Sequence, residues 1–159
     1  MKDSIRGVVR GILDQYLERN HYRRTPERYA ILDAVYSING HFSLEQLSAR
    51  LEKDNFRVSR ATLYNTMRLL LELRLVLRHR FQSGTKYEAC YEHDDHCHQI
   101  CTICGKVTEL QVPELAQSIM NTKLKRFRKD GFSLYIYGVC SSCRAKITRN
   151  LTLKNKEKK

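Results

Sequence analysis

The first half of the chain repeats apolar side chains every three or four positions, which is the period of a helix with one buried face. Tyr16 and Leu17, for example, continue a face that begins at Ile5. Polar caps and a glycine interrupt the pattern, which therefore predicts four separate helices. They cover residues 3–19, a segment from Thr25 to just before Gly40, a segment from Ser43 to Leu51, and a segment from Ser59 or Thr62 to about Leu73.

Two of these helices have clear initiation signals. Thr25 suits the N-cap, Pro26 suits the first turn, and Glu27 puts a negative charge at the positive end of the second helix. Ser43 and Gln46 have the spacing of a capping box at the start of the third helix.

After Leu73 the period of the apolar pattern shortens to two. Residues 76–81 and 85–88, joined by a Gln-Ser-Gly turn at 82–84, predict a β-hairpin. Helices followed by a two-stranded wing are typical of a winged helix-turn-helix domain. An arbitrary α+β domain is the alternative, but the basic residues of the fourth helix and the wing favour DNA binding.

The second half predicts a smaller α/β unit of about three strands and one helix. Strands are expected at 99–101, 106–110 and 132–140, and the helix is expected to open at Pro113 and end at Gly131. Its apolar face includes Leu115, Ile119, Met120, Leu124 and Phe127. A unit this small is marginal alone, so a structural ion and dimerisation would both stabilise it.

The predicted fold class is therefore α+β. We expect a winged-helix DNA-binding domain over residues 1–88 and an α/β dimerisation and metal-binding domain over 89–150. A Lys-rich tail over 151–159 is expected to be disordered.

The net charge of the chain indicates a class of binding partner. The chain has 29 Lys and Arg against 17 Asp and Glu, a net charge of +12. Such an excess is typical of proteins that bind phosphate backbones, although a soluble basic protein with a Lys-rich tail is the alternative. The charged N-terminus has no apolar signal region, and no apolar run approaches the roughly 20 residues that span a bilayer. We expect a cytoplasmic protein without membrane contact.

The cysteines predict a metal centre. Cys101 and Cys104, and again Cys140 and Cys143, form two Cys-x-x-Cys knuckles. In a reducing compartment such pairs favour metal over disulfide, and four thiolates suit one tetrahedral Zn²⁺ that stabilises the fold. A second, more open site is indicated by the histidines and acids just before the first knuckle.

Four segments together resemble the ferric uptake regulator family. They are residues 25–32, 59–67, 96–107 and 135–143, and the resemblance runs in order over roughly 20–145. Its most specific part is the string His-x-His-x-x-Cys-x-x-Cys-Gly-Lys, which starts at His96. The resemblance implies a homodimeric, metal-sensing transcription factor that represses metal- or haem-acquisition genes, with zinc uptake as an alternative target.

The resemblance also implies which residues meet double-stranded operator DNA. The fourth helix becomes the recognition helix, and Tyr64 becomes a base contact through its ring against thymine methyl groups. The expected DNA-binding set is Arg23, Arg28, Arg57, Arg60, Thr62, Tyr64, Asn65 and Arg68. For each arginine, a solvated surface charge is the alternative.

The same resemblance implies a regulatory metal site that couples the two domains. Its ligands are expected to be His41, Glu88, His96, His98 and Glu109, with Glu92 as a competitor for Glu88. Imidazole and carboxylate ligands suit Fe²⁺, Mn²⁺, Co²⁺ or Zn²⁺, and the sequence does not choose among them.

Cys97, between two predicted ligand histidines, is unusual. It is either an idle small residue, a metal ligand, a redox-sensitive thiol, or an axial ligand to haem. Cys90 is expected to be a buried strand thiol.

The sequence disfavours two other classes of function. A zinc hydrolase or redox enzyme is disfavoured, because the chain has no His-Glu-x-x-His, no nucleophile motif and no nucleotide loop. A zinc-ribbon interaction module without DNA binding is disfavoured by the winged-helix half and by the charge.

Overall fold

The computed structural model describes residues 2–90, 97–129 and 131–156, with side chains from 5 to 150 within those ranges. The chain forms two compact units, Met1–Glu92 and His93–Lys159. The division falls four residues after the boundary predicted at residue 88. Helices and strands are mixed as expected, and the predicted α+β class is confirmed.

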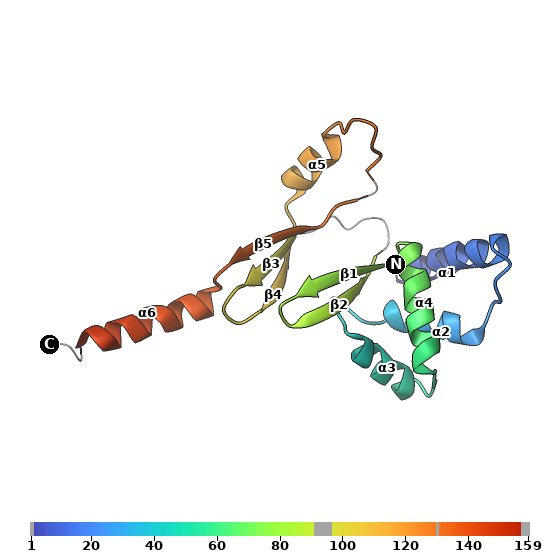
Figure 1. Cartoon of the computed structure of the whole chain (residues 1–159), viewed down its shortest axis with the longest axis horizontal. Coiled ribbons are helices and arrows are strands. Elements are labelled where there is room, and N and C mark those ends of the chain that lie inside the picture. Colours follow the sequence, from blue (N-terminus) through green and yellow to red (C-terminus); the bar gives the residue numbers. More distant parts are fainter. Residues whose placement is uncertain (1, 91–96, 130, 157–159) are drawn as a thin grey trace. The chain divides into compact units, whose positions relative to one another are not determined.

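The first unit consists of four helices followed by a hairpin, in the predicted order (Figure 1). The helices are α1 (Lys2–Arg19), α2 (Pro26–Val35), α3 (Leu44–Lys53) and α4 (Arg60–Glu72). The hairpin pairs β1 (Val76–Phe81) with β2 (Gly84–Ala89) in antiparallel register.

The core of this unit lies where the apolar faces of the four helices meet. Leu13 and Leu17 from α1 pack in one cluster with Leu32, Leu47 and Leu70, and all five are 0% exposed. Burying each such side chain stabilises the fold by about 1.5–3 kcal/mol. The cluster lies within residues 5–89, so the first unit has a hydrophobic core of its own.

Hydrogen bonds at the helix N-termini test the predicted caps, including that of α4, for which the sequence left two candidates. The Ser59 Oγ accepts a hydrogen bond from the Thr62 backbone N–H at 3.0 Å, so Ser59 rather than Thr62 caps α4. The capping box of α3 forms as predicted between Ser43 and Gln46. Thr25 occupies the N-cap position of α2, but its side chain makes no capping hydrogen bond.

A short backbone ladder attaches a loop to the hairpin. Phe42, just before α3, exchanges two hydrogen bonds with Tyr87 of β2, at 2.8 and 2.7 Å. The pairing is antiparallel, and it therefore brings His41 beside Glu88, the residues next to Phe42 and Tyr87 along each segment.

The second unit contains a three-stranded sheet with strand order β4-β3-β5. Its strands are β3 (Cys97–Cys101), β4 (Val107–Leu110) and β5 (Leu134–Gly138). β3 pairs antiparallel with β4 and parallel with β5. The crossover between β4 and β5 contains α5 (Pro113–Asn121), and α6 (Ser141–Lys156) follows β5.

The helix after Pro113 is shorter than predicted. It was expected to reach Gly131 but ends at Asn121, and Leu124 and Phe127 are exposed beyond it, at 46% and 68%. The Lys129 ammonium donates to the backbone carbonyls of three residues at the end of α5, namely Ile119, Met120 and Thr122. These bonds satisfy carbonyls that a longer helix would have used, and they stop the helix.

The C-terminal segment also differs from its prediction. Residues from 151 on were expected to be disordered, and a helix after the second knuckle was not predicted. Instead α6 continues from Ser141 through Lys156. The segment has neither Gly nor Pro between these residues, so nothing in the sequence stops a helix that starts at the knuckle.

Candidate metal centres and nucleic-acid interface

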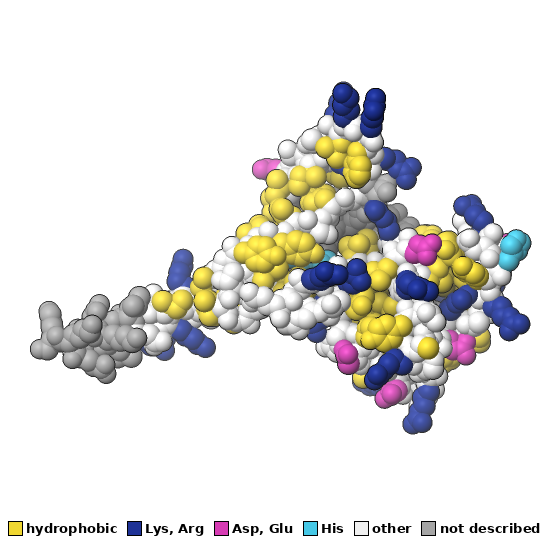
Figure 2. All heavy atoms as spheres, in the orientation of Figure 1, with side chains coloured by type: hydrophobic (Ala, Val, Ile, Leu, Met, Phe, Trp, Pro, Cys, Tyr) yellow, Lys and Arg dark blue, Asp and Glu magenta, His cyan; other side chains and the backbone are white. Residues whose placement is uncertain are grey.

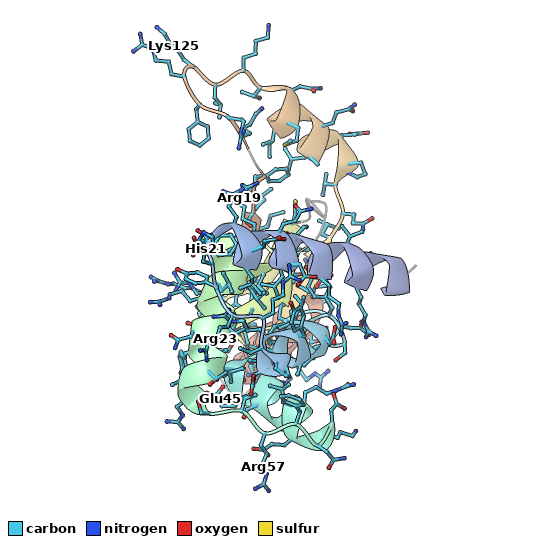
Figure 3. All side chains as sticks on the ribbon, turned by 90° about the vertical axis from the view of Figure 1, so that its right-hand side faces the viewer. Arg19, His21, Arg23, Glu45, Arg57 and Lys125 are labelled. Atoms are coloured by element: carbon cyan, nitrogen blue, oxygen red, sulfur yellow. The ribbon has the colours of Figure 1, made fainter. Side chains whose placement is uncertain are left out.

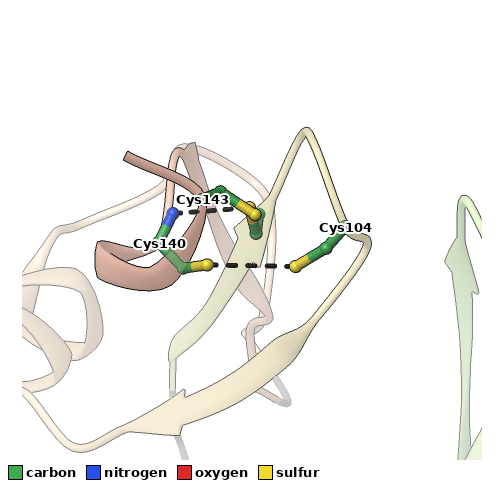
Figure 4. Close-up of side chains that lie close together, drawn as sticks. Cys104, Cys140 and Cys143 are labelled. Atoms are coloured by element: carbon green, nitrogen blue, oxygen red, sulfur yellow. Dashed lines mark hydrogen bonds between the residues drawn. The ribbon is translucent and has the colours of Figure 1, made fainter. Parts of the chain in front are cut away.

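The two Cys-x-x-Cys knuckles meet at one end of the sheet. Cys101 ends β3, and Gly138 lies opposite it at the end of β5, two residues before Cys140. Because β3 and β5 run parallel, the knuckle after each strand emerges at the same edge. The four sulfur atoms of Cys101, Cys104, Cys140 and Cys143 all lie within 4.8 Å of one another. Figure 4 shows Cys104, Cys140 and Cys143 side by side.

The spacing of the sulfurs fits a single zinc ion. The Cys104 and Cys140 sulfurs are 3.9 Å apart. Two thiolates on a tetrahedral zinc, with Zn–S bonds of about 2.3 Å, are separated by about 3.8 Å. The cluster therefore has the donor set and the dimensions of a closed structural zinc site.

Backbone amides prepare one of the four thiols for metal binding. The Cys140 backbone N–H donates to the Cys101 sulfur at 3.3 Å. With the amides of Cys104 and Ile103 it lowers the pKa of Cys101 to about 6, because each N–H stabilises the thiolate. The pKa of Cys143 is instead raised to about 12 by its hydrogen bonds to the neighbouring sulfurs and by burial. All four thiols are therefore deprotonated at the same time only when a cation is bound between them.

A second group of metal-ligating side chains lies inside the first unit. Glu88 on β2 is 8% exposed, and its Oε2 lies 3.0 Å from His79 Nε2 and 3.5 Å from His41 Nε2. The ligand atoms of these three residues lie within 4.8 Å of one another. Two imidazoles and a carboxylate are a donor set for Zn²⁺, Fe²⁺, Mn²⁺ or Co²⁺.

The fold holds the two imidazoles firmly. The ring of Phe81 stacks on His79 at 5.5 Å between centroids and meets the edge of His41 at 5.2 Å. The two histidine rings are themselves 5.0 Å apart in a T-shaped contact.

The predicted regulatory ligands divide between the units. His41 and Glu88 come together in the first unit. In the second unit, His98 on β3 pairs in register with Glu109 on β4 and stacks on Tyr135 at 5.4 Å. His96 lies outside the described residues, and so does Glu92, the competitor for Glu88. The five-residue ligand set therefore stays a prediction.

His79 is the residue that the sequence reasoning missed. The alternation of exposed and buried side chains along β1 could have identified it. Arg78 and Arg80 are exposed on one face of the strand, and His79 lies on the other. On that face Glu88 is its diagonal cross-strand neighbour, since Glu88 pairs with Leu77. An imidazole that is 1% exposed and lies between exposed arginines needs a buried polar partner, which Glu88 provides.

Both remaining cysteines differ from the metal ligands. Cys97 is 2% exposed and lies in the middle strand of the sheet, opposite Leu110 and Leu134. Cys90 was predicted to be a buried strand thiol, but it is half-buried and follows the end of β2. Its backbone is held by Leu75 and by the Tyr36 hydroxyl.

The outer face of α4 presents most of the predicted DNA contacts. Arg60, Tyr64, Asn65 and Arg68 recur at helical spacing and are exposed, Tyr64 at 54%. Thr62 differs, because it is half-buried and its hydroxyl lies 2.8 Å from the Ser59 hydroxyl. Its position suits support of the cap better than contact with a base.

A groove continues this face toward the hairpin. It has a volume of about 530 Å³, and its lining includes Tyr64, Arg78, Arg80 and Lys86. Figure 2 shows Lys and Arg side chains projecting from the first unit on the face in view, with acidic side chains between them.

The other predicted arginines lie at turns. Arg57, between α3 and α4, is exposed and points away from the body of the unit (Figure 3). Arg23 precedes α2, and its backbone carbonyl accepts a hydrogen bond from Arg28 at 2.5 Å. Arg28 is half-buried and lies over the Tyr22 ring at 5.8 Å, which leaves Arg23 the more accessible of the two.

Membrane insertion has no support in the described residues, where every helix is too short or too polar to cross a bilayer.

Comparison with known proteins gives a consistent answer. The model of the ferric uptake regulator family matches residues 19–137. A ferric uptake regulation protein of Campylobacter upsaliensis is 31% identical over 135 residues, which cover 82% of this chain and 85% of the relative.

Solved structures agree with the sequence comparison. The Vibrio cholerae ferric uptake regulator, described with rearranged DNA-binding domains, has a TM-score of 0.56 at 27% identity and covers 80% of this chain and 98% of its own. The Pseudomonas aeruginosa ferric uptake regulator with manganese has a TM-score of 0.68 at 23% identity, covering 80% and 97%, and supports the fold.

Proposed function

The chain belongs to the ferric uptake regulator family, and on that premise we propose that it is a homodimeric repressor whose binding to operator DNA depends on a divalent metal ion. The family consists of metal-responsive transcription regulators rather than enzymes. We further propose a cytoplasmic location and target genes of metal acquisition.

DNA reading is assigned to α4 and the hairpin. The exposed side chains of α4 suit entry into a major groove, with Tyr64 and Asn65 toward base edges and Arg60 and Arg68 toward phosphates. Arg78, Arg80 and Lys86 on the hairpin carry charge that suits the flanking backbone, and Arg23 and Arg57 extend it at the turns.

The cysteine cluster is assigned to structural Zn²⁺. Its four sulfurs have the separations that one tetrahedral ion requires. Zinc there would tie the ends of β3 and β5 to the start of α6, in a unit too small for a large core. Haem is left out of the proposal, because the one thiol considered for it, Cys97, is buried in the sheet.

The regulatory ion is assigned to His41 and Glu88, with His96, His98 and Glu109 from the second unit as the further expected ligands. One observation carries the proposal: His41 and Glu88 belong to the same compact unit as α4, and Glu88 lies on the hairpin itself. An ion held there would bind a side chain of the same hairpin that lines the groove beside α4. Fe²⁺, Mn²⁺ and Zn²⁺ all suit the donors, so the metal is left to experiment.

Dimerisation is supported by apolar side chains that a lone second unit leaves in solvent. Ile136, Tyr137 and Val139, at and after β5, are 42%, 63% and 45% exposed, and Leu115 and Met120 of α5 are 37% and 40% exposed. A second copy of the chain would cover such surface.

The test combines metal content with DNA selection. The purified protein is expected to retain one zinc per chain after mild chelation and to lose a second ion. Duplexes selected from a random pool in the presence of Fe²⁺, Mn²⁺ or Zn²⁺ should share a two-fold symmetric sequence, and removal of the second ion should abolish their binding. Selected binding that is indifferent to every divalent ion would contradict the proposal.

A further inference from the structure

The three donors in the first unit have the mutual spacing of ligands on one ion. For metal–nitrogen and metal–oxygen bonds of about 2.1 Å, neighbouring ligand atoms lie about 3.0 Å apart around an octahedral ion and about 3.4 Å apart around a tetrahedral one. Glu88 Oε2 lies 3.0 Å from His79 Nε2 and 3.5 Å from His41 Nε2. The separations therefore bracket the values expected for a shared ion.

The environment of His79 also suits a ligand. The side chain is 1% exposed, and its ring is fixed between Phe81 on one side and Glu88 at the Nε2 atom. A ring that is already oriented loses little further freedom when it binds an ion. Its Nε2 points at the same carboxylate oxygen as that of His41, which is how two imidazoles converge on one position.

We propose that His79 is a direct ligand of the regulatory ion, so that His41, His79 and Glu88 form a three-ligand site for a divalent transition metal wholly inside the DNA-reading unit. This inference rests on the proposed function and extends it. The first unit then binds the ion without help, and the ligands of the second unit add affinity to an ion that is already in place.

The competing role for His79 is positioning. In that case its Nε2–H only donates to Glu88 and orients the carboxylate, in the way that groups outside a metal's ligand shell commonly do. The substitution His79→Gln separates the roles, because the Gln amide N–H can still donate to Glu88 but replaces an imidazole by a poor transition-metal ligand.

The experiment titrates Co²⁺ into full-length protein that retains its structural zinc. Wild type, His79→Gln and the control His21→Gln are compared by visible absorption, which reports the number and type of ligands. His21 is an exposed histidine of the same unit outside the cluster. His79→Gln is expected to change the band positions and to weaken Co²⁺ binding by more than the roughly 10- to 100-fold that loss of a group outside the ligand shell costs. His21→Gln should match wild type.

A second background tests whether the first unit suffices. The substitution His98→Ala removes an expected ligand of the second unit. Co²⁺ should still bind, and His79→Gln added to this background should abolish binding. Unchanged affinity and spectrum in His79→Gln would overturn the ligand role, and loss of Co²⁺ binding in His98→Ala alone would overturn the self-sufficient site.

A measurement on wild type covers the case in which His79→Gln does not fold. In protein labelled with ¹⁵N-histidine, the diamagnetic ion Zn²⁺ should turn the Nε2 atoms of His41 and His79 into metal-bound nitrogens that carry no proton, and leave the ring of His21 unchanged. A His79 Nε2 that keeps an attached proton when the second ion is bound would refute the proposal. If the same wild-type protein binds selected duplexes in a metal-dependent way, the proposed function stands even where the His79 ligand fails.

Discussion

Individual side chains in this protein act through their burial and their immediate partners. The same residue type has different settings within the first unit: Tyr64 is exposed on α4, whereas Tyr29 is half-buried and donates its hydroxyl to Asp14. The cysteines show a similar contrast, since Cys101 has a lowered pKa and Cys143 a raised one within one cluster. Two predictions belong to this scale.

Removing the Tyr64 ring should weaken operator binding. Tyr64→Ala deletes an exposed aromatic from the centre of the α4 face and no core contact, so we expect about a 10- to 100-fold loss of affinity for the selected duplex, the effect of about 1–3 kcal/mol per base contact. Binding curves at fixed salt measure it. Phe127→Ala, at an exposed aromatic of the second unit, is the matched control, and an equal loss in both variants would count against a base contact.

Zinc affinity at the cysteine cluster should fall as the pH falls. The ion binds thiolates, and the pKa of Cys101 is lowered to about 6, so this ligand is deprotonated above that pH and protonates as the pH drops through it. The pKa of Cys143, raised to about 12, means that this thiol must lose its proton on binding even at neutral pH. Competition with a chelator should therefore show weaker zinc at pH 5 than at pH 7 and tighter zinc again at pH 8. Affinity that is flat over this range would exclude thiolate ligation.

At the scale of helices and strands, local rules predicted beginnings better than ends. The start of α3 follows from its Ser43 capping box, whereas for α4 the sequence left Ser59 and Thr62 as alternatives and the structure selects Ser59. The end of α5 could not be predicted, because it depends on Lys129, which returns from ten residues away to bind the carbonyl of Ile119. Apolar periodicity through Leu124 and Phe127 suggested a longer helix, and the tertiary contact overrides it.

The cap of α4 should matter for both stability and DNA binding. Ser59→Ala removes the acceptor for the Thr62 N–H and should cost about 1 kcal/mol of unfolding free energy. The loosened first turn contains Arg60, so affinity for the duplex should also fall. Chemical denaturation and binding curves measure the two effects. Ser133→Ala, at an exposed serine of the second unit, should change neither, and a stable Ser59→Ala with full affinity would show that the cap is dispensable.

For the whole molecule, the sequence predicted two units and the zinc cluster, but not the complete second site. The knuckle spacing predicted four zinc ligands, and the sulfurs of these four cysteines come together. His41 and Glu88 were predicted through a family resemblance, whereas His79 joins them only through the register of the hairpin. A register is set by long-range pairing, so a scan for motifs does not show it.

Loss of the structural zinc should affect the two units unequally. Cys101→Ser removes one of four ligands at the sheet edge of the second unit, whereas the hydrophobic core of the first unit lies within residues 5–89. We therefore expect loss of zinc, loss of the dimer and early melting of the second unit, with the first unit still folded. Calorimetry should resolve two transitions, and sedimentation should report a monomer. A variant that melts in one step and remains dimeric would contradict separate stabilisation.

The parallel pairing of β3 with β5 has a topological consequence. Since Cys104 and Cys140 approach to 3.9 Å, a shared zinc would close the chain between them into a ring that contains β4, α5 and the exposed segment around Phe127. A protease cut in this segment would leave two fragments that are still joined through their cysteines to the same zinc ion. The nicked protein would hold together by metal as well as by strand pairing, and a chelator, not a denaturant alone, would be needed to release the pieces fully.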